Sequence, residues 1–161
     1  MSQAKSVDPK VKSNVELGRR VLFPVDKSLN ARGAFEWFFK FGYRQNDFII
    51  FANIIHPRYT RGIINLESTS FNPSEDFQLN FDEAHKIEDE YKELAKNVGV
   101  NFSTTFIADT DVVDAINMLA DQEKANLIIT TALGESIYDL IGDAKIPVLI
   151  VPSEEMDKQN S

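Results

Sequence analysis

The sequence contains no cysteine, and this absence removes several classes of protein. Without thiols the chain has no disulfide scaffold, no cysteine nucleophile and no thiolate metal site. His56 and His85 are the only imidazoles, so a structural zinc site is not expected and we assign no metal ligand.

Glycine is scarce as well, with seven residues at positions 18, 33, 42, 62, 99, 134 and 142. This spacing leaves no GxGxxG dinucleotide loop, no GxxxxGK[ST] phosphate loop and no GxSxG nucleophile elbow. A dinucleotide dehydrogenase, a P-loop NTPase and an α/β-hydrolase are therefore not expected. We assign no catalytic residue.

Excess positive charge and long apolar runs are also lacking. The chain carries 17 Lys and Arg against 25 Asp and Glu, a formal net charge of −8. A duplex nucleic-acid binder needs a basic footprint instead. No run approaches the ~20 apolar residues of a membrane span, and the N-terminus has no secretory apolar region. We expect a cytoplasmic protein that binds neither nucleic acid nor membrane.

What is present is enough for one folded domain, since 43% of the 161 residues are hydrophobic. The polar residues at the start predict a flexible leader over 1–18, and those at the end predict a flexible tail over 153–161. The domain itself is expected over residues 19–152.

Within this domain the apolar pattern alternates between strand-like and helix-like segments. Strands are predicted at 20–26, 47–55, 101–108, 126–131 and 147–152, and helices at 34–41, 81–98, 112–119 and 136–142. Such alternation predicts an α/β fold, a five-stranded parallel, doubly wound sheet with helices on both faces. The segment Arg58–Asp76 has no clear period and is expected to be a long loop.

The first predicted helix is dense in aromatic residues. Phe35, Phe38 and Phe41 recur at helical spacing and are expected in the core. Trp37 or Phe39 is then left for an exposed side of the helix.

Ligands of doubly wound sheets bind beyond the carboxyl ends of the strands, where the strand order reverses. Asp26 follows the first predicted strand and would lie at this edge. It either contacts a polar ligand or caps the next helix, and the sequence does not decide between these roles. His56, Arg58 and Arg61 form a small basic cluster after the second strand, which is either an anion-contacting loop or, the interpretation we favour, a solvated loop.

In these segments the chain resembles the universal stress protein family. The resemblance rests on Val21-Leu22-Phe23-Pro24-Val25-Asp26, on the strand ending Asn53-Ile54-Ile55, and on Ala125–Ile129 followed by Ile146-Pro147-Val148-Leu149-Ile150-Val151-Pro152. It implies a Rossmann-like sheet of the adenine nucleotide α-hydrolase-like type. Many members of this family bind ATP at the switch point, and others act as dimeric stress-response proteins without nucleotide.

The resemblance implies a candidate nucleotide site at Pro24, Val25, Asp26 and Ile54, which match the nucleoside part. The phosphate part does not match. Members of the family that bind ATP resemble one another in carrying a G-x2-G-x9-G-[S/T] motif after the fourth strand, and this chain lacks it. Only Thr130–Ile146 is available for this motif, and the segment is too short for it. Gly134 falls on the last glycine of the motif, and the next residue, where the motif has Ser or Thr, is Glu135, followed by Ser136. Glu135 is either a built-in anion at the helix start, where a phosphate would lie, or an ordinary exposed acid.

The last strand carries a second expectation. Pro147, Val148, Leu149, Ile150 and Val151 would form a short apolar sheet edge, and relatives resemble one another in dimerising through this strand. We expect a homodimeric stress-response or regulatory protein with weak or lost ATP binding, whose protein partner the sequence does not name. The alternative is an ATP-binding member, with Mg²⁺, that uses a shortened site of Asp26 and Gly134–Ser136. We expect no enzyme, although slow ATP hydrolysis stays open under this alternative.

Overall fold

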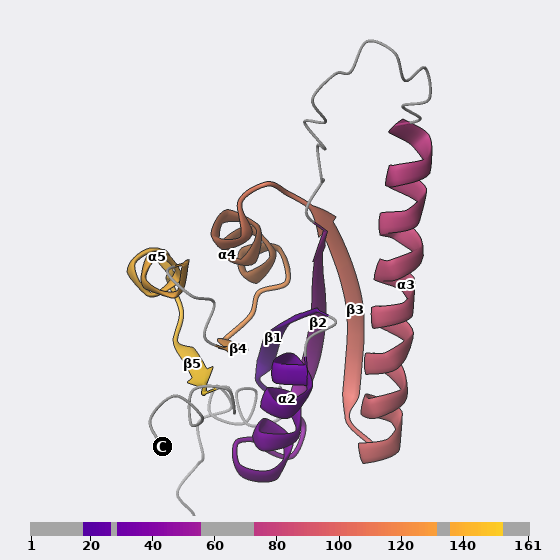
Figure 1. Cartoon of the computed structure of the whole chain (residues 1–161). Helices are drawn as coiled ribbons and strands as arrows, with labels where there is room; N and C mark the ends of the chain where they lie inside the picture. The colour runs from indigo at the N-terminus through magenta and orange to yellow at the C-terminus, as the bar shows by residue number, and fades with distance from the viewer. Residues whose placement is uncertain (1–17, 27–28, 56–72, 132–135, 153–161) are drawn as a thin grey trace, which may run out of the picture.

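The computed structural model describes residues 18–26, 29–55, 73–131 and 136–152. Along them strands and helices alternate (Figure 1): β1 (Arg20–Val25), α2 (Leu29–Phe41), β2 (Phe48–Ile55), α3 (Pro73–Val98), β3 (Asn101–Ala108), α4 (Val112–Gln122), β4 (Leu127–Thr131), α5 (Ser136–Asp143) and β5 (Val148–Val151). All strand pairs are parallel, in the order β3-β2-β1-β4-β5. The predicted α/β fold is confirmed, whereas the leader, apart from Gly18, and the tail lie outside the described residues.

The sheet separates two apolar cores. Alternate residues of β1 point to opposite faces: Phe23 packs with α2 and α3, and Leu22 packs with α4 and α5. Figure 1 shows the same arrangement, with α3 along β3 on one side of the sheet and α4 on the other. Because both faces of the central strands are covered, their sequences are apolar almost throughout.

One part of the aromatic prediction for α2 was wrong. Phe35 and Phe38 are buried, but Phe41 is 65% exposed and lies beside the exposed Trp37, with the two rings tilted by 44°. The helical period of 3.6 residues carries the buried stripe from Phe38 to position 42 and not to position 41. Position 42 is a glycine. A Cβ atom at this position would lie 2.7 Å from the Phe38 ring, so the ring occupies the space that a side chain at position 42 would need.

The long helix α3 begins earlier than the sequence suggested. It starts at Pro73, a residue type suited to the first helical position, so residues 73–76 are helical and not part of a loop. The rest of the predicted loop lies outside the described ranges. Gly99, at φ +75°, follows the end of α3 as predicted. Asp111 caps α4 through its carboxylate, which accepts from the Val113 and Asp114 amides. No helix in the described parts of the chain is both long and apolar enough to cross a membrane.

Candidate functional site

The carboxyl ends of β1 and β2 bring the predicted nucleoside-site residues to one edge of the sheet. Pro24 pairs with Ala52 and Val25 with Asn53, and the exposed Asp26 follows directly after β1. The strand order places β1 next to β4. From β1 the chain adds β2 and β3 on one side of the sheet and then β4 and β5 on the other, so the strand order reverses between β1 and β4. This is the place where doubly wound sheets bind ligands.

Pro24 shapes this switch point through the N–H that it lacks. β1 pairs with β2 along its whole length, but with β4 only at Val21–Leu127 and Leu22–Ile128. The Arg20 carbonyl accepts from the Asn126 amide on the β4 side, so every second residue, Pro24 included, faces β4. Because proline cannot donate there, the β1–β4 ladder ends before the carboxyl edge.

The predicted site residues do not share one face of the sheet. Val25 is 5% exposed and belongs to the core under α2 and α3. Ile54 is partly buried and packs on the opposite side, with the α4 and α5 core. Of the two, only Ile54 retains surface for a ligand.

The remaining predicted residues follow β4. Gly134 and Glu135 lie outside the described residues, and Ser136 is the first residue of α5. The two readings of Glu135 therefore stay predictions. Four residues, 132–135, separate the end of β4 from the start of α5.

A polar contact that the sequence analysis missed fixes α3 against the same end of the sheet. Asn53 is 7% exposed, and its amide donates to the Ala84 carbonyl of α3 at 3.2 Å. A polar residue in the otherwise apolar run of β2 was the signal for it. The void beside Asn53 and Ala84 measures about 10 Å³, which is too small for a nucleoside.

Glu88 of α3 makes the second polar contact with the sheet. The Lys92 ammonium lies 2.6 Å from its carboxylate, and the Thr104 hydroxyl of β3 donates to it. The Lys92 hydrogen bond, followed by that of Thr104, holds the pKa of Glu88 below its ordinary value of 4.5. Glu88 thus pairs with Lys92 within α3 and, through Thr104, also joins α3 to β3.

This geometry makes the stability of the protein depend on Glu88 and on pH. Since folding lowers the Glu88 pKa, its contribution is complete above pH 4.5 and is lost as the pH falls through the folded-state value. We expect Glu88→Gln to lower the urea midpoint at pH 7 and to approach wild type near pH 3. Glu93→Gln is the control, because the pair of Glu93 with Lys96 is exposed. A constant Glu88→Gln difference from pH 7 to pH 3 would contradict the assignment.

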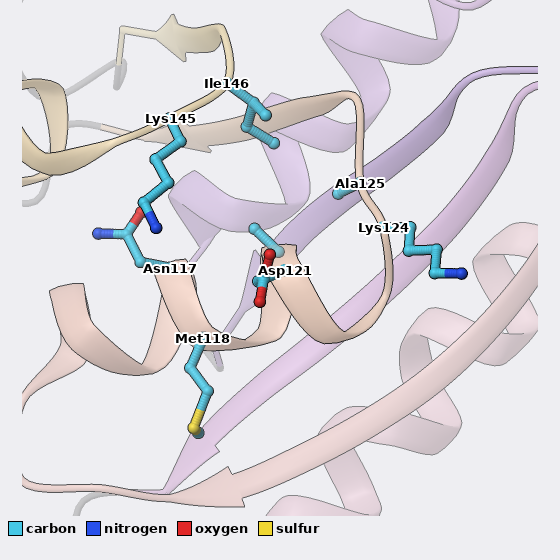
Figure 2. A pocket seen from close by; sticks show the side chains of 8 residues that line it. Asn117, Met118, Asp121, Lys124, Ala125, Lys145 and Ile146 are labelled. Atoms are coloured by element: carbon cyan, nitrogen blue, oxygen red, sulfur yellow. The ribbon is translucent and has the colours of Figure 1, made fainter.

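In the described part of the chain, hollows large enough for a small molecule include two beside α4. One, of about 370 Å³, lies between the start of α4 and α5 and is lined by Asp111, Asp114, Asp139 and Asp143 without a basic residue. The other, of about 440 Å³, lies toward the opposite end of α4. Figure 2 shows its polar side chains, which come from α4 and from the turns before β4 and β5. Neither includes Asp26 or Ile54.

Charge and metal chemistry are limited near these features. Among the described residues no group of three or more His, Cys, Asp or Glu side chains is arranged to hold a metal ion. The acidic hollow repels anions, since a carboxylate and a phosphate charge about 4 Å apart cost ~4 kcal/mol at an effective dielectric constant of 20.

The last predicted feature is the apolar edge, and its position is confirmed. β5 is the outermost strand on the β4 side, with Val148, Leu149 and Ile150 half-buried and Val151 buried. Pro147 precedes it and is exposed. The pairing of this edge with a second copy stays a prediction.

Comparison with solved structures supports this description of the fold. A universal stress protein family member from Burkholderia pseudomallei is similar at a TM-score of 0.68 and 19% identity, over 83% of this chain and 96% of that one. An Arabidopsis thaliana family member with AMP bound is similar at a TM-score of 0.65 and 16% identity, over 86% of this chain and 94% of that one. A universal stress protein from Archaeoglobus fulgidus in complex with dAMP is similar at a TM-score of 0.60 and 17% identity, over 84% of this chain and 98% of that one.

Family comparison is the more decisive evidence, because structures this distant in sequence establish only the fold. No curated protein matched this chain. The model of the universal stress protein family matches residues 18–152, which include the whole domain expected from the sequence. This chain therefore belongs to the universal stress protein family.

Proposed function

We propose that this protein is a non-enzymatic, cytoplasmic stress-response or regulatory protein that acts as a homodimer and has weak or lost ATP binding. The observation that carries the proposal is the short connection after β4. Only four residues separate β4 from α5, and they include a single glycine. The G-x2-G-x9-G-[S/T] motif, whose loop and following helix N-terminus would offer backbone N–H groups to phosphates, does not fit into this connection.

Electrostatics supports the same proposal. The hollow beside α4 and α5 carries four carboxylates, on a chain with a net charge of −8. Hydrogen bonds to a charged acceptor are worth ~1.5–3 kcal/mol each, and a micromolar site needs about 8 kcal/mol in total. Loss of the N–H donors of the loop therefore weakens the binding of a triphosphate more than it weakens the binding of a nucleoside.

The homodimer is proposed through β5. This strand is apolar, lies at the sheet edge and is only half-buried, so a second copy would cover it. Pro147 and Pro152 at its ends would limit pairing to a short register. Ile150→Lys is expected to remove the association that depends on β5 and so to lower the average mass in sedimentation experiments, since it places a charge on this edge.

A second candidate, nucleotide binding at the switch point, has specific support. The relatives from Arabidopsis thaliana and Archaeoglobus fulgidus hold AMP and dAMP. In this chain Asp26 is exposed at the switch point, and the β1–β4 ladder ends early beside it. A shortened site would use Asp26, Ile54, Gly134 and Ser136, with Mg²⁺ on the phosphates of ATP.

Titration of the full chain with AMP and with Mg-ATP separates the candidates. We expect no calorimetric heat and no shift of Tm at millimolar Mg-ATP. A micromolar Kd would instead stabilise the protein by ~4 kcal/mol at this concentration, which raises Tm by several degrees. Micromolar ATP binding that Asp26→Ala abolishes would overturn the main proposal. AMP binding without ATP binding would support it, because the nucleoside part alone would be retained.

Glu135→Ser is expected not to restore ATP binding, because the glycine loop is still missing.

A further inference from the structure

In the part of the chain that the structure describes, the outer edge of β3, at the other side of the sheet from β5, has no strand paired with it. β3 pairs with β2 at all eight of its residues, and no described strand pairs with its outer side. Natural edge strands are protected by charged residues, proline or bulges. The sequence of β3, NFSTTFIA, contains no charged residue, no proline and no glycine. The edge is also twice as long as that of β5, which has four residues.

Backbone geometry identifies the groups that β3 presents outward. The Asp109 amide donates to the Ile55 carbonyl of β2. Because successive residues of a strand face opposite sides, odd-numbered residues of β3 bond to β2 and even-numbered residues face out. Phe102, Thr104 and Phe106 therefore present their N–H and C=O groups along the free edge.

The order of side chains along this edge is nearly the same in both directions. Around Thr104, Phe102 mirrors Phe106 and Ser103 mirrors Thr105. An antiparallel partner of the same sequence, related by a two-fold axis at Thr104, would place each phenylalanine opposite the other. Ser103 would lie opposite the partner's Thr105. This self-complementarity singles out one occupant for the edge, and we propose that it is β3 of a second copy of this chain.

The side chains on both faces of the edge suit such pairing. Phe102 and Phe106 lie on the α3 face, where Phe106 packs edge-on against Phe81 at 5.6 Å between ring centroids and is still 48% exposed. A partner strand would cover this exposed ring with an aromatic residue, which is a favourable cross-strand pair. Ser103 and Thr105, on the other face, are half-buried and uncharged. The three outward-facing residues would exchange about six backbone hydrogen bonds with the partner.

This interface does not depend on the proposed β5 dimer. β3 and β5 are opposite edges of the sheet. Two different two-fold interfaces on opposite edges join copies into an open string and not into a closed pair. The net charge of −8 on each copy opposes association, so we expect β3 pairing to strengthen with salt, as screening shortens the range of repulsion.

Cysteine cross-linking tests the pairing and its register, because the natural chain contains no cysteine. In the proposed register, residue 103 lies opposite the partner's residue 105, with Cα atoms ~4.5 Å apart, which is within disulfide range. Two copies of residue 103 would be ~8 Å apart, which is too far. A mixture of Ser103→Cys and Thr105→Cys proteins should therefore cross-link at least tenfold more under mild oxidation than either variant alone.

Charge reversal tests the same register without a covalent bond. Ser103→Lys with Thr105→Lys sets like charges opposite each other, whereas Ser103→Lys with Thr105→Glu sets opposite charges. Both should be made in the Ile150→Lys background, so that β5 pairing does not contribute to sedimentation. We expect the Lys/Lys variant to weaken self-association at least tenfold relative to the Lys/Glu variant, with equal melting temperatures. Cross-linking of the mixture at the level of the single variants, or equal sedimentation of the two charge variants, would overturn the proposal.

Discussion

Replacing Phe51 with alanine is expected to lower the free energy of unfolding by about 3–5 kcal/mol. Phe51 lies on β2 and is 1% exposed. Its ring centroid lies 5.4 Å from that of Phe35 on α2 and 5.3 Å from that of Tyr91 on α3. Truncation would therefore leave a cavity where both helices meet the sheet, and rigid neighbours could fill it only in part. Against a typical total of ~5–15 kcal/mol, this loss could leave the variant barely folded at 37 °C.

Urea unfolding followed by far-UV circular dichroism measures the effect. Phe41→Ala is the matched control, since it removes the same side chain from a site that is 65% exposed. We expect the control to cost less than about 1 kcal/mol. Equal losses for the two variants would mean that the aromatic core between the sheet, α2 and α3 is not assembled as described.

Replacing Arg19 with methionine is expected to cost about 3–5 kcal/mol, because it leaves a buried carboxylate without its charged partner. Asp47 is 1% exposed. Arg19 donates from Nε to Oδ1 at 2.9 Å and from Nη2 to Oδ2 at 2.6 Å, and Nη2 also donates to the Gly42 carbonyl. Among its hydrogen bonds to described residues, Asp47 would then keep the one from the Arg44 amide.

The arginine of an exposed pair provides the control for this prediction. Arg32 is 46% exposed and forms ion pairs with Glu36 and Glu90. Arg32→Met should cost less than about 1 kcal/mol, as surface pairs do. The double variant Arg19→Met, Asp47→Asn should be more stable than Arg19→Met alone, because its buried amide carries no charge. A less stable double variant would show that lost packing, and not the unpaired charge, dominates the cost.

The helices and strands could be predicted because their signals are local. The apolar runs of β1 and β2 and the helical spacing of Ile87, Tyr91 and Ala95 in α3 each reflect burial on a period that the backbone imposes. Phe41 shows the limit of this reasoning. At a helix end, one position decides whether a side chain meets the core, and the packing of Phe38 against Gly42 decided it.

The candidate site could be predicted only in part. The sequence placed Pro24, Asp26 and Ile54 at the carboxyl edge, because strand ends and winding rules are local or general. It did not separate Val25 from this set, since the face to which a strand residue points depends on the helices that cover it. The contacts of Asn53 with Ala84 and of Glu88 with Thr104 join elements far apart in the chain, and no local pattern encodes them.

By itself the sequence determined the alternation of strands and helices, the absence of thiol and phosphate-loop chemistry, and the family resemblance that the family model confirms. Each of these depends on residue type and spacing alone. Only the tertiary structure decided which partner Pro24 faces, where the β1–β4 ladder stops, and that no described strand pairs with the outer edge of the uncharged, eight-residue β3. These features depend on which strands become neighbours, and that is set by the simultaneous packing of both cores.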